Sequence, residues 1–112
     1  MSLFEDAPSQ TLDRPLRVAI LGCSGSIGTQ ALDVCRLHAD KIQVVGLSVF
    51  SSCEKLVHVQ REFHVPHVVV ANATHKDDPI LTELPDTCDL RFGPDAVRRL
   101  ATLPEVDCVL VA

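Results

Sequence analysis

The sequence predicts an α/β fold with an open, doubly wound, mostly parallel sheet and helices on both of its faces. Three observations carry this prediction. Apolar runs of strand length alternate along the chain with segments of helical periodicity. The run at residues 42–49 has an apolar centre (VVGL), as expected for a strand covered on both faces. A glycine-rich turn links the first apolar run to a helical pattern within residues 16–37.

Size and composition limit the possible functions. A chain of 112 residues can form one small domain. Hydrophobic residues make up 46% and charged residues 22%, which is typical of globular proteins. No apolar run is long enough to predict a membrane span, and a net charge of −5 argues against nucleic-acid partners and anionic membranes. We therefore expect a cytoplasmic domain that binds small molecules.

The first third of the chain predicts an arm, a strand and a helix. Residues 1–14 are polar and aperiodic and contain Pro8, which predicts a disordered N-terminal arm, with the folded domain over residues 15–112. The run LRVAIL at residues 16–21 predicts the first strand. A helix is expected at residues 26–38, with one apolar stripe that should be buried: Ile27, Ala31, Val34, Cys35 and His38.

The middle of the chain repeats this alternation. A second strand is expected at residues 42–49, followed by a helix that starts near Ser52. Ser51 and Glu54 have the spacing of a capping box, in which each side chain accepts a hydrogen bond from a backbone N–H of the other residue. The helix has an apolar stripe at Leu56, Val59 and Phe63, and a third strand is expected at residues 67–71.

The last third contains shorter elements. Residues 72–87 are polar, with one helical turn expected at residues 79–84, and residues 88–92 form a short extended piece. Gly-Pro-Asp at residues 93–95 opens a helix, because proline fits the first helical position and aspartate complements the helix dipole. With a final strand at residues 107–112, the chain contains one Rossmann-like half and the start of the second, truncated after about the fourth main strand.

The turn at residues 22–28 reads GCSGSIG and has the properties of a phosphate-binding loop. Gly22 permits a sharp turn after the strand, Gly25 lets the backbone approach a pyrophosphate, and Gly28 permits close packing of the helix. Ser24 and Ser26 add hydroxyl groups. Backbone N–H groups at a helix start attract a phosphate, so this turn within a β-α-β unit predicts dinucleotide binding. The alternative is a tight turn without a ligand.

The end of the second predicted strand distinguishes NADP from NAD. An NAD site usually has a carboxylate there to bind the ribose 2′-OH, whereas this chain has Phe50, Ser51 and Ser52. The two serines and the following helix N-terminus could bind a 2′-phosphate, and Lys55 lies one turn further along. NADP is therefore favoured over NAD. The alternative is that the serines only cap the helix.

The chain shows no pattern of catalytic or metal-binding residues. Its five cysteines are odd in number and contain no C-x-x-C, which favours reduced thiols over disulfides or a zinc site: Cys23, Cys35, Cys53, Cys88 and Cys108. No nucleophile–base pair and no cluster of metal-binding carboxylates is visible. We therefore expect neither a catalytic residue nor a metal ligand in this chain.

Two segments together resemble one enzyme family. The segment GCSGSIGTQALDV, followed by VVGLS, is similar to the N-terminus of 1-deoxy-D-xylulose 5-phosphate reductoisomerases, which typically carry G-S-T-G-S-I-G-x-x-(T/A)-L-D-V there. The similarity in layout extends from about Arg17 to Val111. The resemblance implies NADPH binding by Ser24, Gly25, Ser26 and Ile27. It also implies that the end of the second strand binds the 2′-phosphate, although many members have Gly-Lys-Asn or a glycine-rich run where this chain has Phe-Ser-Ser.

The resemblance also implies a reaction. The family rearranges 1-deoxy-D-xylulose 5-phosphate, and NADPH reduces the product to 2-C-methyl-D-erythritol 4-phosphate in the non-mevalonate isoprenoid pathway. A divalent metal, Mg²⁺ or Mn²⁺, is held by acidic residues that would lie beyond this chain. The chain is thus expected to be the N-terminal NADPH-binding part of a longer enzyme, inactive alone, whose whole form binds a phosphosugar and is a homodimer.

Two other functions remain open from the sequence. Another NADP-dependent dehydrogenase of the semialdehyde type would supply a catalytic cysteine after residue 112. A non-enzymatic nucleotide-binding or CoA-binding regulatory module would need no further residues, but its last strand would then be exposed at the sheet edge.

Overall fold

The computed structural model describes residues 14–112 and has the predicted α/β architecture. Within these residues five strands form one sheet in the order β4-β3-β2-β1-β5, and each neighbouring pair is parallel. The strands are β1 (Leu16–Leu21), β2 (Ile42–Val49), β3 (His67–Val70), β4 (Asp89–Phe92) and β5 (Cys108–Val111). The other elements are the helices α2 (Ser26–Leu37), α3 (Cys53–Phe63) and α4 (Pro94–Ala101) and the 3-10 turns η2 (Ala73–His75) and η3 (Pro79–Glu83).

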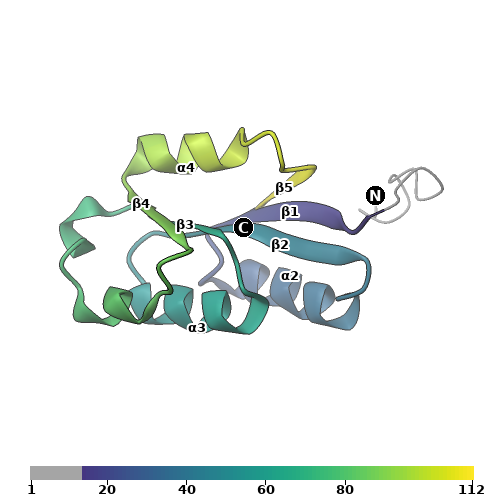
Figure 1. The fold of residues 1–112 in the computed structure, drawn as a ribbon, viewed down its shortest axis with the longest axis horizontal. Coiled ribbons are helices and arrows are strands. Elements are labelled where there is room, and N and C mark those ends of the chain that lie inside the picture. Colours follow the sequence, from purple (N-terminus) through teal and green to yellow (C-terminus); the bar gives the residue numbers. More distant parts are fainter. Residues whose placement is uncertain (1–13) are drawn as a thin grey trace.

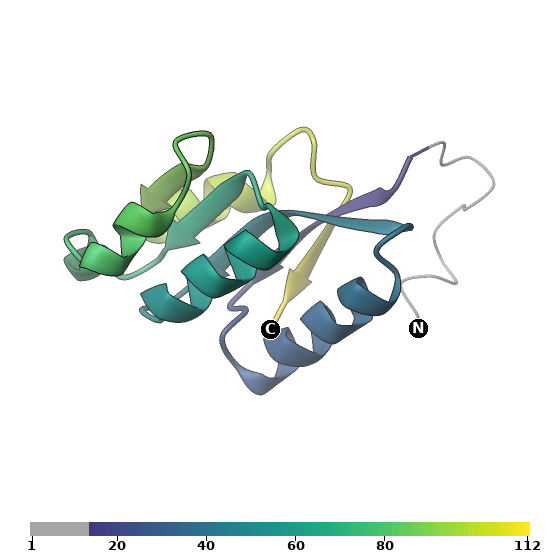
Figure 2. The same ribbon diagram turned by 60° about the horizontal axis from the view of Figure 1, so that its bottom comes forward.

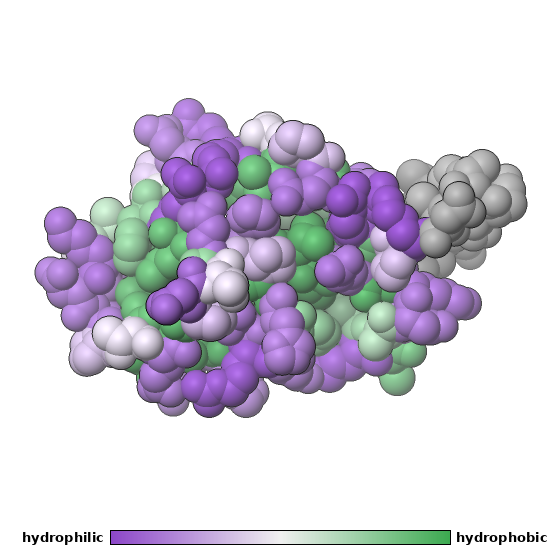
Figure 3. Space-filling view, viewed as in Figure 1, coloured by the Kyte–Doolittle hydropathy of each residue, from purple (hydrophilic) through white to green (hydrophobic). Residues whose placement is uncertain are grey.

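Helices cover both faces of the sheet. Helix α4 lies on one face, and α2 and α3 lie on the other (Figure 1). Figure 2 shows α2 and α3 side by side beneath the strands. The larger core lies between these two helices and the sheet and includes Ile20, Leu32, Leu47 and Leu56. In the space-filling view, polar side chains cover the helices and apolar groups gather between the layers (Figure 3).

Strand β2 lies at the centre of the sheet, as its apolar sequence predicted. Every residue of β2 except Gln43 is buried. At Gly46 the sheet meets helix α4 at short range, because a β-carbon there would lie 2.8 Å from Cδ1 of Leu100. The absence of a side chain at Gly46 therefore lets the buried Leu100 pack directly against the sheet.

The buried face of α2 differs from the predicted stripe. Cys35 is buried as expected, but Ile27 is 63% exposed and Val34 is 38% exposed. The residues that face the core are instead Gly28, Leu32 and Cys35, at the i, i+4, i+7 spacing of one helical face. The prediction that Ile27 and Val34 are buried was therefore wrong.

Helix α3 begins at Cys53, but its capping differs from the prediction. The N-cap is Ser52, whose side chain makes no capping hydrogen bond. A capping box that starts at Ser52 would need Glu or Gln at position 55, where this chain has Lys55. The predicted pair of Ser51 and Glu54 is therefore one residue out of register. The predicted apolar stripe packs into the core: Leu56, Val59 and Phe63.

The last helix and strand agree with the sequence pattern. Gly93 is the N-cap of α4 with a φ of +97°, Pro94 occupies the first helical position and Asp95 lies in the first turn. Strand β5 pairs with β1 at one edge of the sheet, and Val111 is 77% exposed. The last strand is thus exposed at an edge within the described part of the chain.

A salt bridge joins the start of the described chain to Asp107, the residue before β5. The predicted arm lies outside the described residues except for Arg14, which donates to both carboxylate oxygens of Asp107 at 2.6 and 3.0 Å. The backbone N–H of Arg17 donates to the same carboxylate at 2.9 Å. Among residues 14–112 no helix is both long enough and apolar enough to cross a membrane.

Candidate functional site

The glycine-rich turn lies at the carboxyl end of β1 and is held by the neighbouring strand β2. Gly22 has a φ of +75°, a conformation that favours glycine and produces the sharp turn predicted after the strand. The N–H groups of Gly22 and Cys23 donate to the carbonyl oxygen of Ser48 at 3.0 and 2.9 Å, and Oγ of Ser48 also accepts from Gly22 at 3.1 Å. Ser48 is buried, so this contact fixes the turn from within the sheet.

The first turn of α2 is open to solvent. Gly25 is its N-cap and forms no side-chain capping bond, and a β-carbon at Gly25 would have no atom within 4 Å. The loop residues around it are exposed, as a ligand-binding loop requires: Ser24, Gly25, Ser26 and Ile27. The N–H groups at a helix start have no partner within the helix. This turn therefore offers backbone donors and the positive end of the helix dipole to an anion.

Gly28 has a different role from Gly25. A β-carbon at Gly28 would lie 2.6–2.8 Å from backbone atoms of Cys23, which is closer than real β-carbons approach. The predicted close packing of the helix at Gly28 is present, and the backbone that Gly28 contacts is that of Cys23 in the glycine-rich turn. Gly28 lets the start of α2 lie directly on the chain that leaves β1.

The carboxyl end of β2 lies beside this turn. Phe50 is 67% exposed, Ser51 is half-buried and Ser52 is exposed. Both serines line a pocket of about 710 Å³ between α3 and η3. Its charged and titratable lining residues are three basic side chains and three acidic ones: Lys55, His58, Arg61, Glu54, Asp78 and Glu83. Arg61 pairs with Glu83 at 2.9 Å, so part of this positive charge is compensated within the pocket.

Cys23 of the glycine-rich turn and Lys55 of α3 are both charged or titratable groups at this end of the sheet. Burial raises the pKa of the Cys23 thiol to about 11, and the positive charge of Lys55 opposes this shift. The Lys55 side chain lines the pocket at the start of α3. The fold brings all nine predicted cofactor-binding residues to the carboxyl ends of the adjacent strands β1 and β2: Gly22, Ser24, Gly25, Ser26, Ile27, Gly28, Phe50, Ser51 and Ser52.

At the same pocket the structure assembles a cluster that the sequence pattern did not indicate. Cys53, His75 and Asp78 place one potential ligand atom each within 4.8 Å of one another. The five cysteines are free thiols, as predicted. Cys53 lies 22 residues before His75, so neither a short motif nor helical periodicity could reveal the cluster.

Comparison with known proteins identifies relatives for nearly the whole described chain. The family model described as 1-deoxy-D-xylulose 5-phosphate reductoisomerase matches residues 18–112. A protein of that name from Ralstonia nicotianae is 36% identical over 100 residues, which cover 87% of this chain and 25% of the relative. One from Mycolicibacterium smegmatis is 44% identical over 98 residues, covering 86% and 23%. The chain thus spans about a quarter of the length of the curated relatives that it matches.

Solved structures of reductoisomerases have the same fold in this region. The enzyme from Zymomonas mobilis in complex with NADPH superposes with a TM-score of 0.74 at 25% identity, covering 80% of this chain and 24% of that one. A reductoisomerase in complex with NADPH, fosmidomycin and magnesium superposes with a TM-score of 0.75 at 26% identity, covering 84% and 23%. Together with the family match over residues 18–112, these similarities show that the chain belongs to the 1-deoxy-D-xylulose 5-phosphate reductoisomerase family.

Proposed function

We propose that this chain is the NADPH-binding N-terminal part of a 1-deoxy-D-xylulose 5-phosphate reductoisomerase. The single observation that carries the proposal is the open first turn of α2, where a β-carbon at the N-cap Gly25 would meet no atom within 4 Å. A pyrophosphate placed there accepts hydrogen bonds from backbone N–H groups without meeting a side chain at Gly25. The named NADPH complexes of similar fold support the choice of this dinucleotide.

The loop residues have separate roles in this proposal. Backbone N–H groups of Gly25, Ser26 and Ile27 bind the pyrophosphate, and the hydroxyls of Ser24 and Ser26 add donors. Gly22 and Gly28 complete the site by shaping the turn, since Gly22 adopts a positive φ that glycine readily takes and Gly28 packs against Cys23.

The adenosine end of the cofactor lies against Phe50, Ser51 and Ser52. The exposed Phe50 ring offers an apolar surface to the adenosine. Ser52 makes no side-chain capping bond, so its hydroxyl can donate to a 2′-phosphate, as can that of Ser51. Lys55 lines the same pocket and supplies a positive charge. In this proposal it replaces the lysine of the Gly-Lys-Asn segment that many family members carry where this chain has Phe-Ser-Ser.

The proposed reaction uses residues beyond those present here. When bound, NADPH supplies a hydride for the reductive step, and the part of the chain described here holds and orients the cofactor. In this proposal, the acidic residues that would hold Mg²⁺ or Mn²⁺ and the phosphosugar site lie in the part of the enzyme that this chain does not cover, since the chain spans 25% of the Ralstonia relative. The proposal therefore assigns this chain no catalytic residue. For the whole enzyme, the proposal also includes a cytoplasmic location and a homodimeric assembly.

The family match favours this function over the two alternatives. A semialdehyde-type dehydrogenase and a regulatory nucleotide-binding module both explain a glycine-rich turn. Neither explains a match to the reductoisomerase model that extends from β1 through β5.

The direct test is a titration with NADPH of the wild-type chain and of Gly25→Leu, monitored by nucleotide fluorescence. A β-carbon at position 25 would meet no atom within 4 Å in the free protein, and a leucine side chain would extend from it into the space proposed for the pyrophosphate. We expect wild-type binding to be saturable and Gly25→Leu to lose it, with an unchanged circular dichroism spectrum.

Thr87→Leu is the matched control. Thr87 is exposed and precedes β4, at the amino ends of the strands and away from the glycine-rich turn. NADPH binding should be retained in this variant. Equal affinities in wild type and Gly25→Leu would place the phosphate elsewhere and contradict the proposal.

A further inference from the structure

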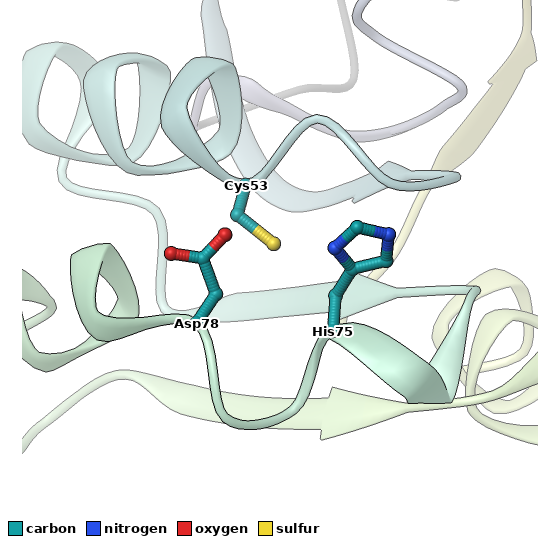
Figure 4. Close-up of side chains that lie close together, drawn as sticks. All are labelled: Cys53, His75 and Asp78. Atoms are coloured by element: carbon teal, nitrogen blue, oxygen red, sulfur yellow. The ribbon is translucent and has the colours of Figure 1, made fainter.

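Three side chains of different chemistry meet next to the start of α3. Cys53, His75 and Asp78 point toward one another, with the Cys53 sulfur facing both the carboxylate and the imidazole ring (Figure 4). Their potential ligand atoms all lie within 4.8 Å of one another. Cys53 is buried, whereas His75 and Asp78 are half-buried.

The parallel pairing of β2 and β3 brings these residues together. Backbone hydrogen bonds continue beyond the two strands, from Ala71 N to Val49 O and from Asn72 N to Phe50 O, both at 2.8 Å. The segments that follow the strands therefore leave the sheet side by side. One of them begins α3 with Cys53, and the other contains η2 and η3.

Local hydrogen bonds then fix His75 and Asp78 relative to each other. The N–H of Asp78 donates to the carbonyl oxygen of His75 at 3.0 Å, which closes a turn with both side chains on it. Oδ1 of Asp78 accepts from the N–H of Ile80 at 3.1 Å, and this orients the carboxylate while leaving lone pairs available.

We propose that Cys53, His75 and Asp78 form a binding site for Zn²⁺, with three protein ligands and a fourth position for water. Sulfur, imidazole nitrogen and carboxylate oxygen are the three ligand types that zinc takes in proteins. A thiolate ligand favours zinc over Mg²⁺ or Ca²⁺, which prefer oxygen. This inference does not depend on the proposed cofactor function, and it departs from the expectation that no residue of this chain binds a metal.

The geometry of the cluster requires only a small movement. Zinc bonds of about 2.0–2.3 Å in a tetrahedron separate the ligand atoms by roughly 3.5 Å, so the most distant atoms must approach by about 1 Å. His75 can provide this movement because it is half-buried at the end of a short 3-10 turn. Cys53 and Asp78 also line the pocket of about 710 Å³, which gives a metal a path from solvent.

Metal ligands bind in their deprotonated forms, so Cys53 would bind as a thiolate and Asp78 as a carboxylate. A divalent cation at the cluster would compensate both negative charges.

The test is a titration of the reduced 112-residue chain with Co²⁺, a spectroscopic substitute for Zn²⁺. We expect one Co²⁺ per chain, a thiolate-to-cobalt charge-transfer band in the near ultraviolet, visible bands of tetrahedral cobalt, and displacement by one equivalent of Zn²⁺. Failure to observe saturable binding with a thiolate band would overturn the proposal.

Two variants and one control assign the ligands. Cys53→Ser should abolish the thiolate band. His75→Ala should weaken Co²⁺ binding by at least about 100-fold, because losing even a hydrogen-bond partner of a metal ligand costs about 10–100-fold in affinity. Cys88→Ser, a half-buried cysteine outside the cluster, should bind as wild type does. A band that persists in Cys53→Ser, unchanged affinity in a folded His75→Ala, or loss of the band in Cys88→Ser would each contradict the proposal.

Discussion

Gly28 contacts the backbone of Cys23 so closely that a β-carbon at position 28 would lie 2.6 Å from the Cys23 Cα. Both partners are rigid, because Cys23 is held by its hydrogen bond to Ser48 and Gly28 is part of α2. Replacing Gly28 with alanine should therefore displace the start of α2. We expect Gly28→Ala to lower the free energy of unfolding by about 1–3 kcal/mol, measured by urea denaturation.

Gly25→Ala is the control for this prediction, because it adds the same methyl group three residues earlier. Its backbone is extended, with a φ of −81°, and the new β-carbon would have no atom within 4 Å. The free energy of unfolding should stay within about 0.5 kcal/mol of wild type, as for other exposed substitutions. Equal destabilisation by both substitutions would show that the contact with Cys23 is not the reason for glycine at position 28.

The contact between Gly46 and Leu100 predicts that substitutions at these two positions are coupled. Leu100→Ala removes a buried side chain and should cost about 2–5 kcal/mol of unfolding free energy. Gly46→Ala introduces a methyl group 2.8 Å from Leu100 Cδ1 and should cost about 1–3 kcal/mol. In the double variant the methyl group enters the space that Leu100 vacates, so the total cost should be less than the sum. Strict additivity in a double-mutant cycle would contradict this account.

The interactions of the Asp107 carboxylate predict that part of the folding stability is lost in acid. The Arg14 guanidinium, which donates to the carboxylate, and the Arg17 backbone N–H hold the pKa of Asp107 well below its usual range. Because the folded-state pKa is the lower one, the stabilisation is present above about pH 4, the unfolded value, and is lost as pH falls through the folded value. Asp107→Asn should therefore lower the melting temperature at pH 7, and this difference should shrink in acid. A difference that is independent of pH would exclude the ionised carboxylate as its cause.

The element order could be predicted from sequence because short-range signals specify it. The apolar run of β2 and the Gly93–Pro94 helix start each needed only neighbouring residues. The buried face of α2 could not be predicted in this way, because two apolar stripes overlap on that helix. The contact between Gly28 and Cys23 selects the stripe that continues through Leu32, and Ile27 is therefore exposed.

The same distinction between short-range signals and long-range contacts explains which sites could be predicted. The glycine-rich turn is contiguous in sequence, so its residues and shape could be predicted together. The cluster of Cys53, His75 and Asp78 depends on the register between β2 and β3 and on the turn that follows β3. Such long-range contacts leave no spacing pattern in the sequence. The capping prediction failed for a simpler reason. Ser51 and Ser52 are both acceptable N-cap residues, and Ser52 occupies the N-cap position without a side-chain capping bond.

The preference between NADPH and NADH tests the central claim most directly. The dissociation constants of both should be measured by isothermal titration calorimetry on this chain under identical conditions. If Ser51, Ser52 and Lys55 bind the 2′-phosphate, NADPH should bind about 10- to 100-fold more tightly, which corresponds to one charged hydrogen bond. Equal affinities, tighter NADH binding, or no binding of either nucleotide would contradict the assignment of this chain as an NADPH-binding domain.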